Sequence, residues 1–163
     1  MSSSFKIEKV FDRAGDVMNA LGKLATTSAL VGIPESKTSR DKGEAVNNAT
    51  LAYIHENGSD RAHLPPRPFL KPGVEKAKGT IDSHLKAASK AASDGDSNSI
   101  DREFNKAGQI AVNSIRGMFM PGNNSWPEVK PATQRAKGEE KTTTLVESGQ
   151  MRKAITYIVQ EDA

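Results

Sequence analysis

The sequence predicts an α+β fold that is mostly helical, with a small antiparallel or mixed sheet formed by strands from the N-terminal and C-terminal parts of the chain. Two observations support this prediction. Long stretches repeat apolar residues every three or four positions, as one face of a helix does. Two short segments rich in β-branched or apolar residues, 28–34 and 155–160, lie far apart in the chain. A length of 163 residues suits a single domain over 1–163.

Four segments have the apolar spacing of helices. A helix is predicted over 11–25, after a brief alternation over 5–10 that is typical of a strand. Further helices are predicted over 45–57, 72–92 and 100–118, and the last has the most regular period in the chain. The stripes that predict the first and last helices are Phe11, Ala14, Met18, Leu21 and Ala25, with Val17 and Leu24 beside them, and Ile100, Phe104, Ala107, Ala111, Ile115 and Met118.

Two strands complete the predicted fold. Segment 28–34 is short, apolar and ended by a proline, which favours a buried strand. The final strand alternates, so one face carries Ile155, Tyr157 and Val159 and the other carries Ile158.

Polar segments separate these elements. Three of them, 35–44, 93–99 and 137–144, have no apolar face and are predicted to be mobile loops. A short helix is predicted over 131–136, and Ser148 suits the N-cap of one helical turn before the final strand.

Composition limits the classes of function. The chain has no cysteine, which excludes disulfides and thiol catalysis. No apolar run approaches the roughly 20 residues of a membrane span, and the first residues do not resemble a signal peptide. We therefore expect a protein of a cytoplasm-like compartment without a membrane partner. Its 23 basic residues are interleaved with 20 acidic ones, which favours a mixed solvated surface over a dedicated nucleic-acid site.

The residue pattern predicts no catalytic, cofactor or metal site. His55, His63 and His84 lack the spacing that places two imidazoles on one metal ion. The acidic alternation that begins at Asp94 and Asp96 resembles the start of a calcium loop, but no glutamate lies at its twelfth position. We therefore expect no enzyme and no cofactor.

Two segments combine unusual residues. The first is His55-Glu56-Asn57-Gly58, followed after a short connection by Pro65-Pro66-Arg67-Pro68-Phe69-Leu70. Its prolines hold the backbone extended just ahead of a helix, so the segment is either a rigid connection with Phe69 in the core or a subunit contact through Arg67. The second runs from Trp126-Pro127 through Pro131 and Thr133 to Leu145-x-x-Ser148-Gly149-x-Met151-x-x-Ala154-Ile155.

In this order the segments resemble the phage virion-morphogenesis family of tail-completion (neck) proteins, over about residues 45–160. Members of that family carry a His-Glu-aromatic-Gly element, then Pro-Pro/Ala-Arg-Pro-Phe-Leu before a long helix. A Trp- and Pro-x-Thr-containing segment and a Leu-x-x-Thr-Gly-x-Leu-x-x-Ser-Ile element follow. The sequence departs from this pattern at Asn57, Ser148, Gln150, Met151 and Ala154. The change at Gln150 removes a basic residue and with it any charged contact made there.

The resemblance implies a structural virion protein that forms a ring, commonly sixfold, at the head-proximal end of the tail, where it completes the tail and joins it to the head. The implied partners are copies of itself and other tail or neck proteins (tail terminator, head-closure or tape-measure protein), with DNA passing through the lumen. The implied location is the virion, and the host cytoplasm during assembly. The residues that we expect at interfaces are His55, Glu56, Arg67, Phe69, Trp126, Met151 and Ile158. The alternative is a small basic nucleic-acid-binding or regulatory protein, in line with the sequence pI of about 9.1.

Overall fold

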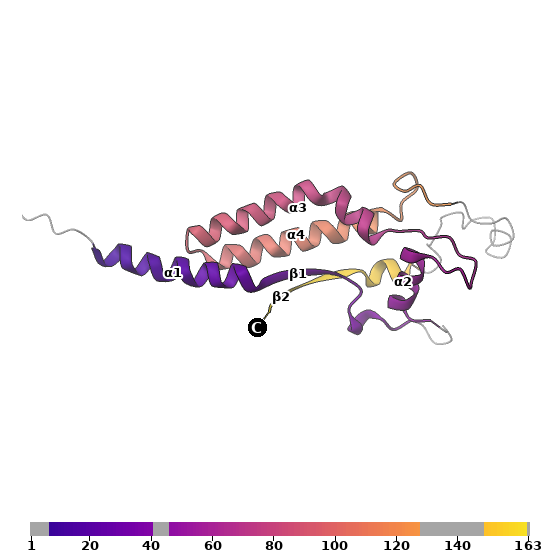
Figure 1. The fold of residues 1–163 in the computed structure, drawn as a ribbon, viewed down its shortest axis with the longest axis horizontal. Coiled ribbons are helices and arrows are strands. Elements are labelled where there is room, and N and C mark those ends of the chain that lie inside the picture. Colours follow the sequence, from indigo (N-terminus) through magenta and orange to yellow (C-terminus); the bar gives the residue numbers. More distant parts are fainter. Residues whose placement is uncertain (1–6, 41–45, 128–148, 163) are drawn as a thin grey trace, which may run out of the picture. The chain divides into compact units, whose positions relative to one another are not determined.

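The computed structural model describes residues 7–40, 46–127 and 149–162. These residues form five α-helices and one two-stranded antiparallel sheet (Figure 1). The elements in chain order are α1 (Ile7–Thr26), β1 (Thr27–Gly32), the 3-10 helix η1 (Glu35–Lys37), α2 (Asn48–Asn57), α3 (Leu70–Ser93), α4 (Ser97–Gly117), α6 (Gln150–Ala154) and β2 (Thr156–Glu161). The predicted α+β class, with a small sheet from the N-terminal and C-terminal strands, is confirmed.

The N-terminal strand predicted over 5–10 is wrong for its described residues. Residues 7–10 belong to α1. They form the first turn of α1 and take no part in the described sheet, which contains only β1 and β2.

The loop predicted over 93–99 is shorter in the structure, because α4 begins at Ser97. Asp96 caps this helix: its carboxylate accepts hydrogen bonds from the hydroxyl of Ser99 and, at 3.0 Å, from the backbone N–H of Ser99. The hydroxyl bond, followed by the backbone bond, holds the pKa of Asp96 below its ordinary value. Asp96, which resembles part of a calcium loop in the sequence, is thus the cap of α4.

The segment predicted as a loop over 35–44 begins with η1, and Asn48 holds the residues after it. The buried Asn48 amide donates to the carbonyls of Lys37 at 3.2 Å and Ser39 at 3.0 Å. Its backbone N–H donates to Thr38 at 2.8 Å. Residues 41–45 lie outside the described part of the chain, as do three other predicted features: the helix over 131–136, the loop over 137–144 and the cap at Ser148. The residue at the N-cap of α6 is Gly149.

Contacts divide the chain into two compact units, each assembled from separate stretches of sequence. Unit 1 comprises Met1–Leu30, Gly79–Gly108 and Ile158–Ala163. Unit 2 comprises Val31–Lys78 and Gln109–Tyr157.

The core of unit 1 is rich in alanine, which lets its helices approach closely. Its buried members are Ala20, Ala88, Ala91, Ala92, Ile100 and Phe104. Beside this cluster, Lys23 of α1 hydrogen-bonds Asp101 of α4 and lies 3.6 Å from Glu161 of β2. The bond to Asp101 is the largest cause that raises the pKa of Lys23. The ammonium group of Lys23 therefore links α1 to α4 and to β2.

The apolar stripe that predicts α1 is not the face that α1 buries. Ala20 and Leu24 pack in the cluster of unit 1. The stripe residues Met18 and Leu21 are 69% and 42% exposed, and Ala14 and Ala25 are also exposed. By contrast, the α4 stripe is buried along its whole length, as its regular period predicts.

In unit 2, α3 and α4 touch at a glycine. A Cβ built on Gly73 would lie 2.6 Å from the Cα of Ile115, closer than any real side chain can come. At the same place the Ser114 hydroxyl donates to the Gly73 carbonyl at 2.6 Å. Only glycine lets the two backbones come this close.

We expect Gly73→Ala to destabilise the protein by about 2 kcal/mol, because the added methyl group forces the backbones of α3 and α4 apart. The matched control is Gly79→Ala in the same helix, where nothing lies within 4 Å of the added atom. This control should stabilise by about 0.5–1 kcal/mol through helix propensity. Urea denaturation of both variants measures the effects, and a stable Gly73→Ala protein would contradict the described contact.

Candidate functional site

Glu56, near the end of α2, caps the start of α3. Its Oε2 accepts hydrogen bonds from the backbone N–H groups of Phe69 at 2.7 Å and Leu70 at 2.9 Å. Its Oε1 accepts from the N–H of Lys71 at 3.1 Å. A carboxylate at a helix N-terminus is also favoured by the helix dipole.

This cap is complete because of a proline. An α-helix leaves its first four N–H groups without a partner inside the helix. At the start of α3 the fourth position is Pro72, which has no N–H. The three groups that exist all donate to Glu56. One side chain thus satisfies the whole helix start and fixes the end of α2 against it.

The proline-rich segment lies between these two helices and is held at both sides. The Arg67 N–H donates to the carbonyl of His55 at 2.7 Å. The Arg67 Nη2 donates to the carbonyl of Pro127 at 3.4 Å, and the Trp126 Nε1 donates to the carbonyl of Pro68 at 2.9 Å. The buried Nε of Arg67 has no hydrogen-bond partner in the described part of the chain, so this guanidinium keeps one donor unused.

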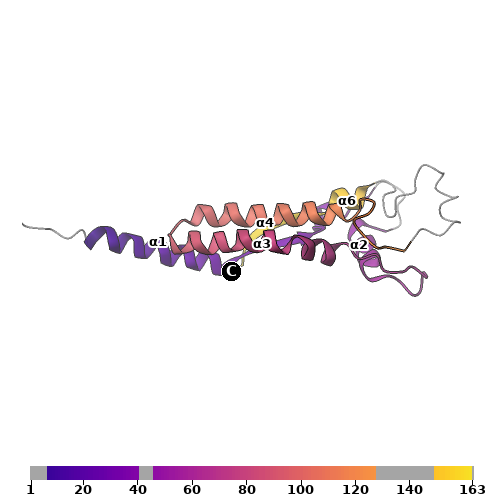
Figure 2. The same ribbon diagram turned by 90° about the horizontal axis from the view of Figure 1, so that it is seen from above.

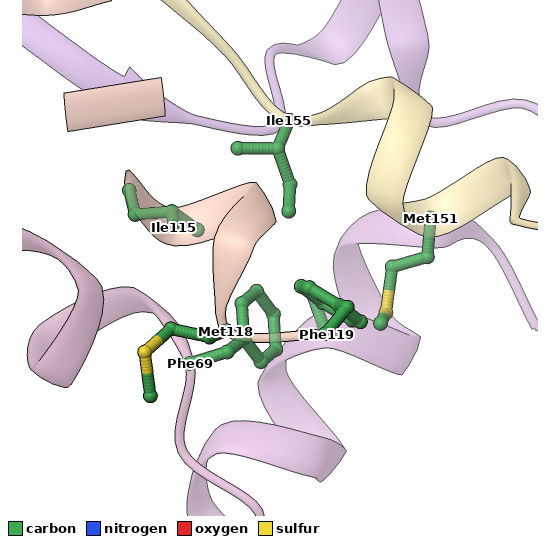
Figure 3. Close-up of a cluster of buried hydrophobic side chains, with 7 residues drawn as sticks. Phe69, Ile115, Met118, Phe119, Met151 and Ile155 are labelled. Atoms are coloured by element: carbon green, nitrogen blue, oxygen red, sulfur yellow. The ribbon is translucent and has the colours of Figure 1, made fainter. Parts of the chain in front are cut away.

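Beneath this segment lies the core of unit 2, which Figure 3 shows. The ring of Phe69 lies 4.9 Å from that of Phe119, and Phe119 meets Trp126 edge to face at 5.6 Å. Met151 and Ile155, at the two ends of the α6 region, point into the same cluster (Figure 3). The two unusual segments of the sequence therefore meet in one core.

The structure brings most of the predicted interface residues together, but not all of them on a surface. His55, Glu56 and Arg67 are partly exposed, and so is Trp126. Phe69 and Met151 are buried at 0% and 5% exposure, so their side chains pack within unit 2 and offer nothing to a neighbouring subunit.

Ile158 belongs to unit 1, apart from the other six residues. It is 45% exposed, whereas Ile155 is fully buried and Val159 packs on the unit 1 core. The expected alternation of the C-terminal strand accounts for this difference.

Unit 1 holds a second cluster of charged groups. Glu103 accepts a hydrogen bond from Lys106 at 2.7 Å and lies 2.6 Å from the Nδ1 of His84. Its side chain is only 12% exposed. The bond from Lys106, followed by the one from His84, holds the pKa of Glu103 below its ordinary value of 4.5. The contact with His84 joins α4 to α3.

Two properties of the described residues bear on metals and membranes. They contain no group of three or more His, Cys, Asp or Glu side chains that could hold a metal ion. None of the helices in this part of the chain is long and apolar enough to cross a bilayer.

The sequence pattern does not identify the roles of two residues of this site. Glu56 is predicted as an interface residue, whereas its carboxylate caps α3; the signal for this cap is Pro72, which leaves only three N–H groups to satisfy at the helix start. The pattern also misses Phe119, which is 1% exposed, because α4 ends at Gly117 and the helical period no longer applies.

Comparisons of this chain with protein-family models, with curated proteins and with solved structures found no match.

We expect Glu56→Ala to lower the free energy of unfolding by about 2 kcal/mol, because three N–H groups at the start of α3 lose their acceptor. Glu56→Gln should lose less, since the amide keeps one acceptor oxygen. The control is Glu75→Ala, whose side chain is 71% exposed and should change stability by no more than about 0.5 kcal/mol. If Glu56→Ala and Glu75→Ala unfold at the same urea concentration, the cap contributes nothing to the free energy of unfolding.

The lowered pKa of Glu103 predicts a pH dependence of stability. The folded state binds a proton at this carboxylate more weakly than the unfolded state, so the stabilisation is complete above pH 4.5 and is lost as the pH falls through the lowered pKa. Glu103→Gln should therefore cost stability at about pH 7 and much less at about pH 3. Urea denaturation at both pH values measures this. If the difference in free energy of unfolding between the wild type and Glu103→Gln is the same at both pH values, the prediction is contradicted.

Proposed function

We propose that this chain is a structural virion protein of a tailed phage, which completes the tail and joins it to the head as a ring-forming oligomer. The partners in this proposal are further copies of the chain and neighbouring tail or neck proteins. The single observation that carries the proposal is the ordered set of motifs that resembles the tail-completion family.

The geometry of unit 2 supports this use of the motifs. Elements that are separate in sequence depend on one another in space: Glu56 caps the helix that follows Phe69, and Trp126 donates to the carbonyl of Pro68. Met151 fills the same core. Motifs whose residues cooperate in one core are expected to occur together and in order, as they do in this chain.

The experiment is to delete the coding sequence from the phage or prophage that carries it and to inspect the lysate by electron microscopy. The expected result is filled heads and tails that remain unjoined, with infectivity restored by the protein supplied in trans. Intact infectious particles without the protein would overturn the proposal.

A second candidate, a small nucleic-acid-binding or regulatory protein, is favoured by one observation. Unit 2 carries fifteen basic and ten acidic residues, a net charge of +5, whereas unit 1 carries eight basic and ten acidic residues, a net charge of −2. The two values sum to the chain's +3. A positively charged unit attracts phosphate groups at low salt. Binding of duplex DNA that persists in about 0.3 M salt would favour this candidate.

Within the proposed function, we expect Arg67→Ala to impair assembly more than folding. Inside the described chain Arg67 makes one long side-chain bond and leaves its Nε unused, so truncation removes little internal stabilisation. An interface arginine, by contrast, typically contributes about 2 kcal/mol or more to binding. The measurements are thermal melting and rescue of the deletion phage, with exposed Arg61→Ala as the control. If Arg67→Ala lowers the melting temperature as severely as it lowers rescue of the deletion phage, Arg67 acts within its own subunit.

A further inference from the structure

One exposed face of α1 is apolar, and the core of unit 1 does not account for it. Ala14, Met18, Leu21 and Ala25 recur every three or four residues and form one stripe. All four are exposed, Met18 by 69%. Because Ala20 and Leu24, on a neighbouring face of α1, already pack in the core of unit 1, the stripe is not needed to hold α1 in place.

The N-terminal part of α1 extends beyond the point where α1 meets the rest of unit 1. At the turn between α3 and α4, a Cβ on Gly95 would lie 3.0 Å from the Cβ of Asp16, so the turn meets α1 at this residue. The part of α1 before Asp16 extends past the turn, as both ribbon views show (Figures 1 and 2). The exposed apolar stripe indicates that α1 packs against another surface.

Charge complementarity identifies a second copy of this chain as that surface. Unit 1 has a net charge of −2 and unit 2 of +5, so unit 1 of one copy is attracted by unit 2 of another. A two-fold contact between two copies of unit 1 would instead bring like charges together. Unit 2 also offers exposed apolar side chains to meet the stripe, chiefly Tyr53 at 70% and Met120 at 47%.

We propose that the exposed stripe of α1 docks on unit 2 of a second copy of this chain, in a head-to-tail contact. This inference deepens the proposed function, because a head-to-tail contact that closes on itself generates a ring. It rests on the proposed function only for the ring's place in the virion. The contact itself is a property of the purified chain.

The first test is sedimentation equilibrium of the purified full-length chain at about 50 mM and about 500 mM salt, since screening weakens attraction between oppositely charged surfaces. We expect association that is weaker at high salt. The double variant Met18→Ser, Leu21→Ser should raise the dissociation constant about tenfold or more. The control Asn19→Ser, exposed on the same helix but outside the stripe, should leave it unchanged. A monomeric wild type, or equal association of all three proteins, would overturn the proposal.

The second test exchanges the charges of the two units. One variant carries Asp16→Lys and Asp82→Lys in unit 1, and the other carries Lys37→Glu, Lys71→Glu and Lys153→Glu in unit 2; all five side chains are exposed. Each variant alone should fail to associate, and an equimolar mixture should associate again because opposite charges meet at both contacts. A mixture that stays monomeric would overturn the proposal. Circular dichroism checks that each variant folds, and if one does not, the stripe variants decide.

Two outcomes separate self-association from nucleic-acid binding and from a role in the virion. If the unit 2 variant loses binding to duplex DNA while its self-association is unchanged, the positive charge serves nucleic acid and the docking proposal fails. If the chain associates as described but its deletion leaves phage particles intact, the docking stands and the virion function fails.

Discussion

Unit 2 depends on one carboxylate. Glu56 satisfies the start of α3, and in doing so it fixes the end of α2, the extended proline segment and the first turn of the long helix relative to one another. The position of Phe69 follows from this, since its own N–H is one of the three donors. Once Phe69 is placed, Phe119 and Trp126 pack around it. The aromatic core is thus positioned by a polar contact outside it.

Much of the fold could be predicted because its signals are local. The regular stripe of α4 is buried as expected, and the stop after Asn57 is a glycine with φ 77°, a conformation that other residues rarely adopt. The alternation around Ile158 places that residue outward. In each case a few neighbouring residues are sufficient to determine the local structure.

The parts that could not be predicted depend on distant partners. The cap of α3 comes from a residue thirteen positions before the first N–H that it binds, so no window around the helix start contains it. For α1 the periodic pattern identifies the helix but not its buried side, because the residue that is fully buried, Ala20, is small and lies outside the apolar stripe. An apolar stripe is evidence of helix in either case. Which stripe is buried depends on the shape of the opposing surface.

The core of unit 2 draws its members from widely separated parts of the chain, from Ala52 on α2 to Ile155 after α6. Contacts of such long range form slowly, because the loop between them must close first. During synthesis the aromatic rings near residues 69 and 119 therefore leave the ribosome long before the C-terminal segment that completes their packing. Met151 and Ile155 act as the closing members of this core, so unit 2 reaches its final form only after residue 155 has been made. The order of synthesis thereby sets the earliest moment at which a second copy can meet a finished unit 2.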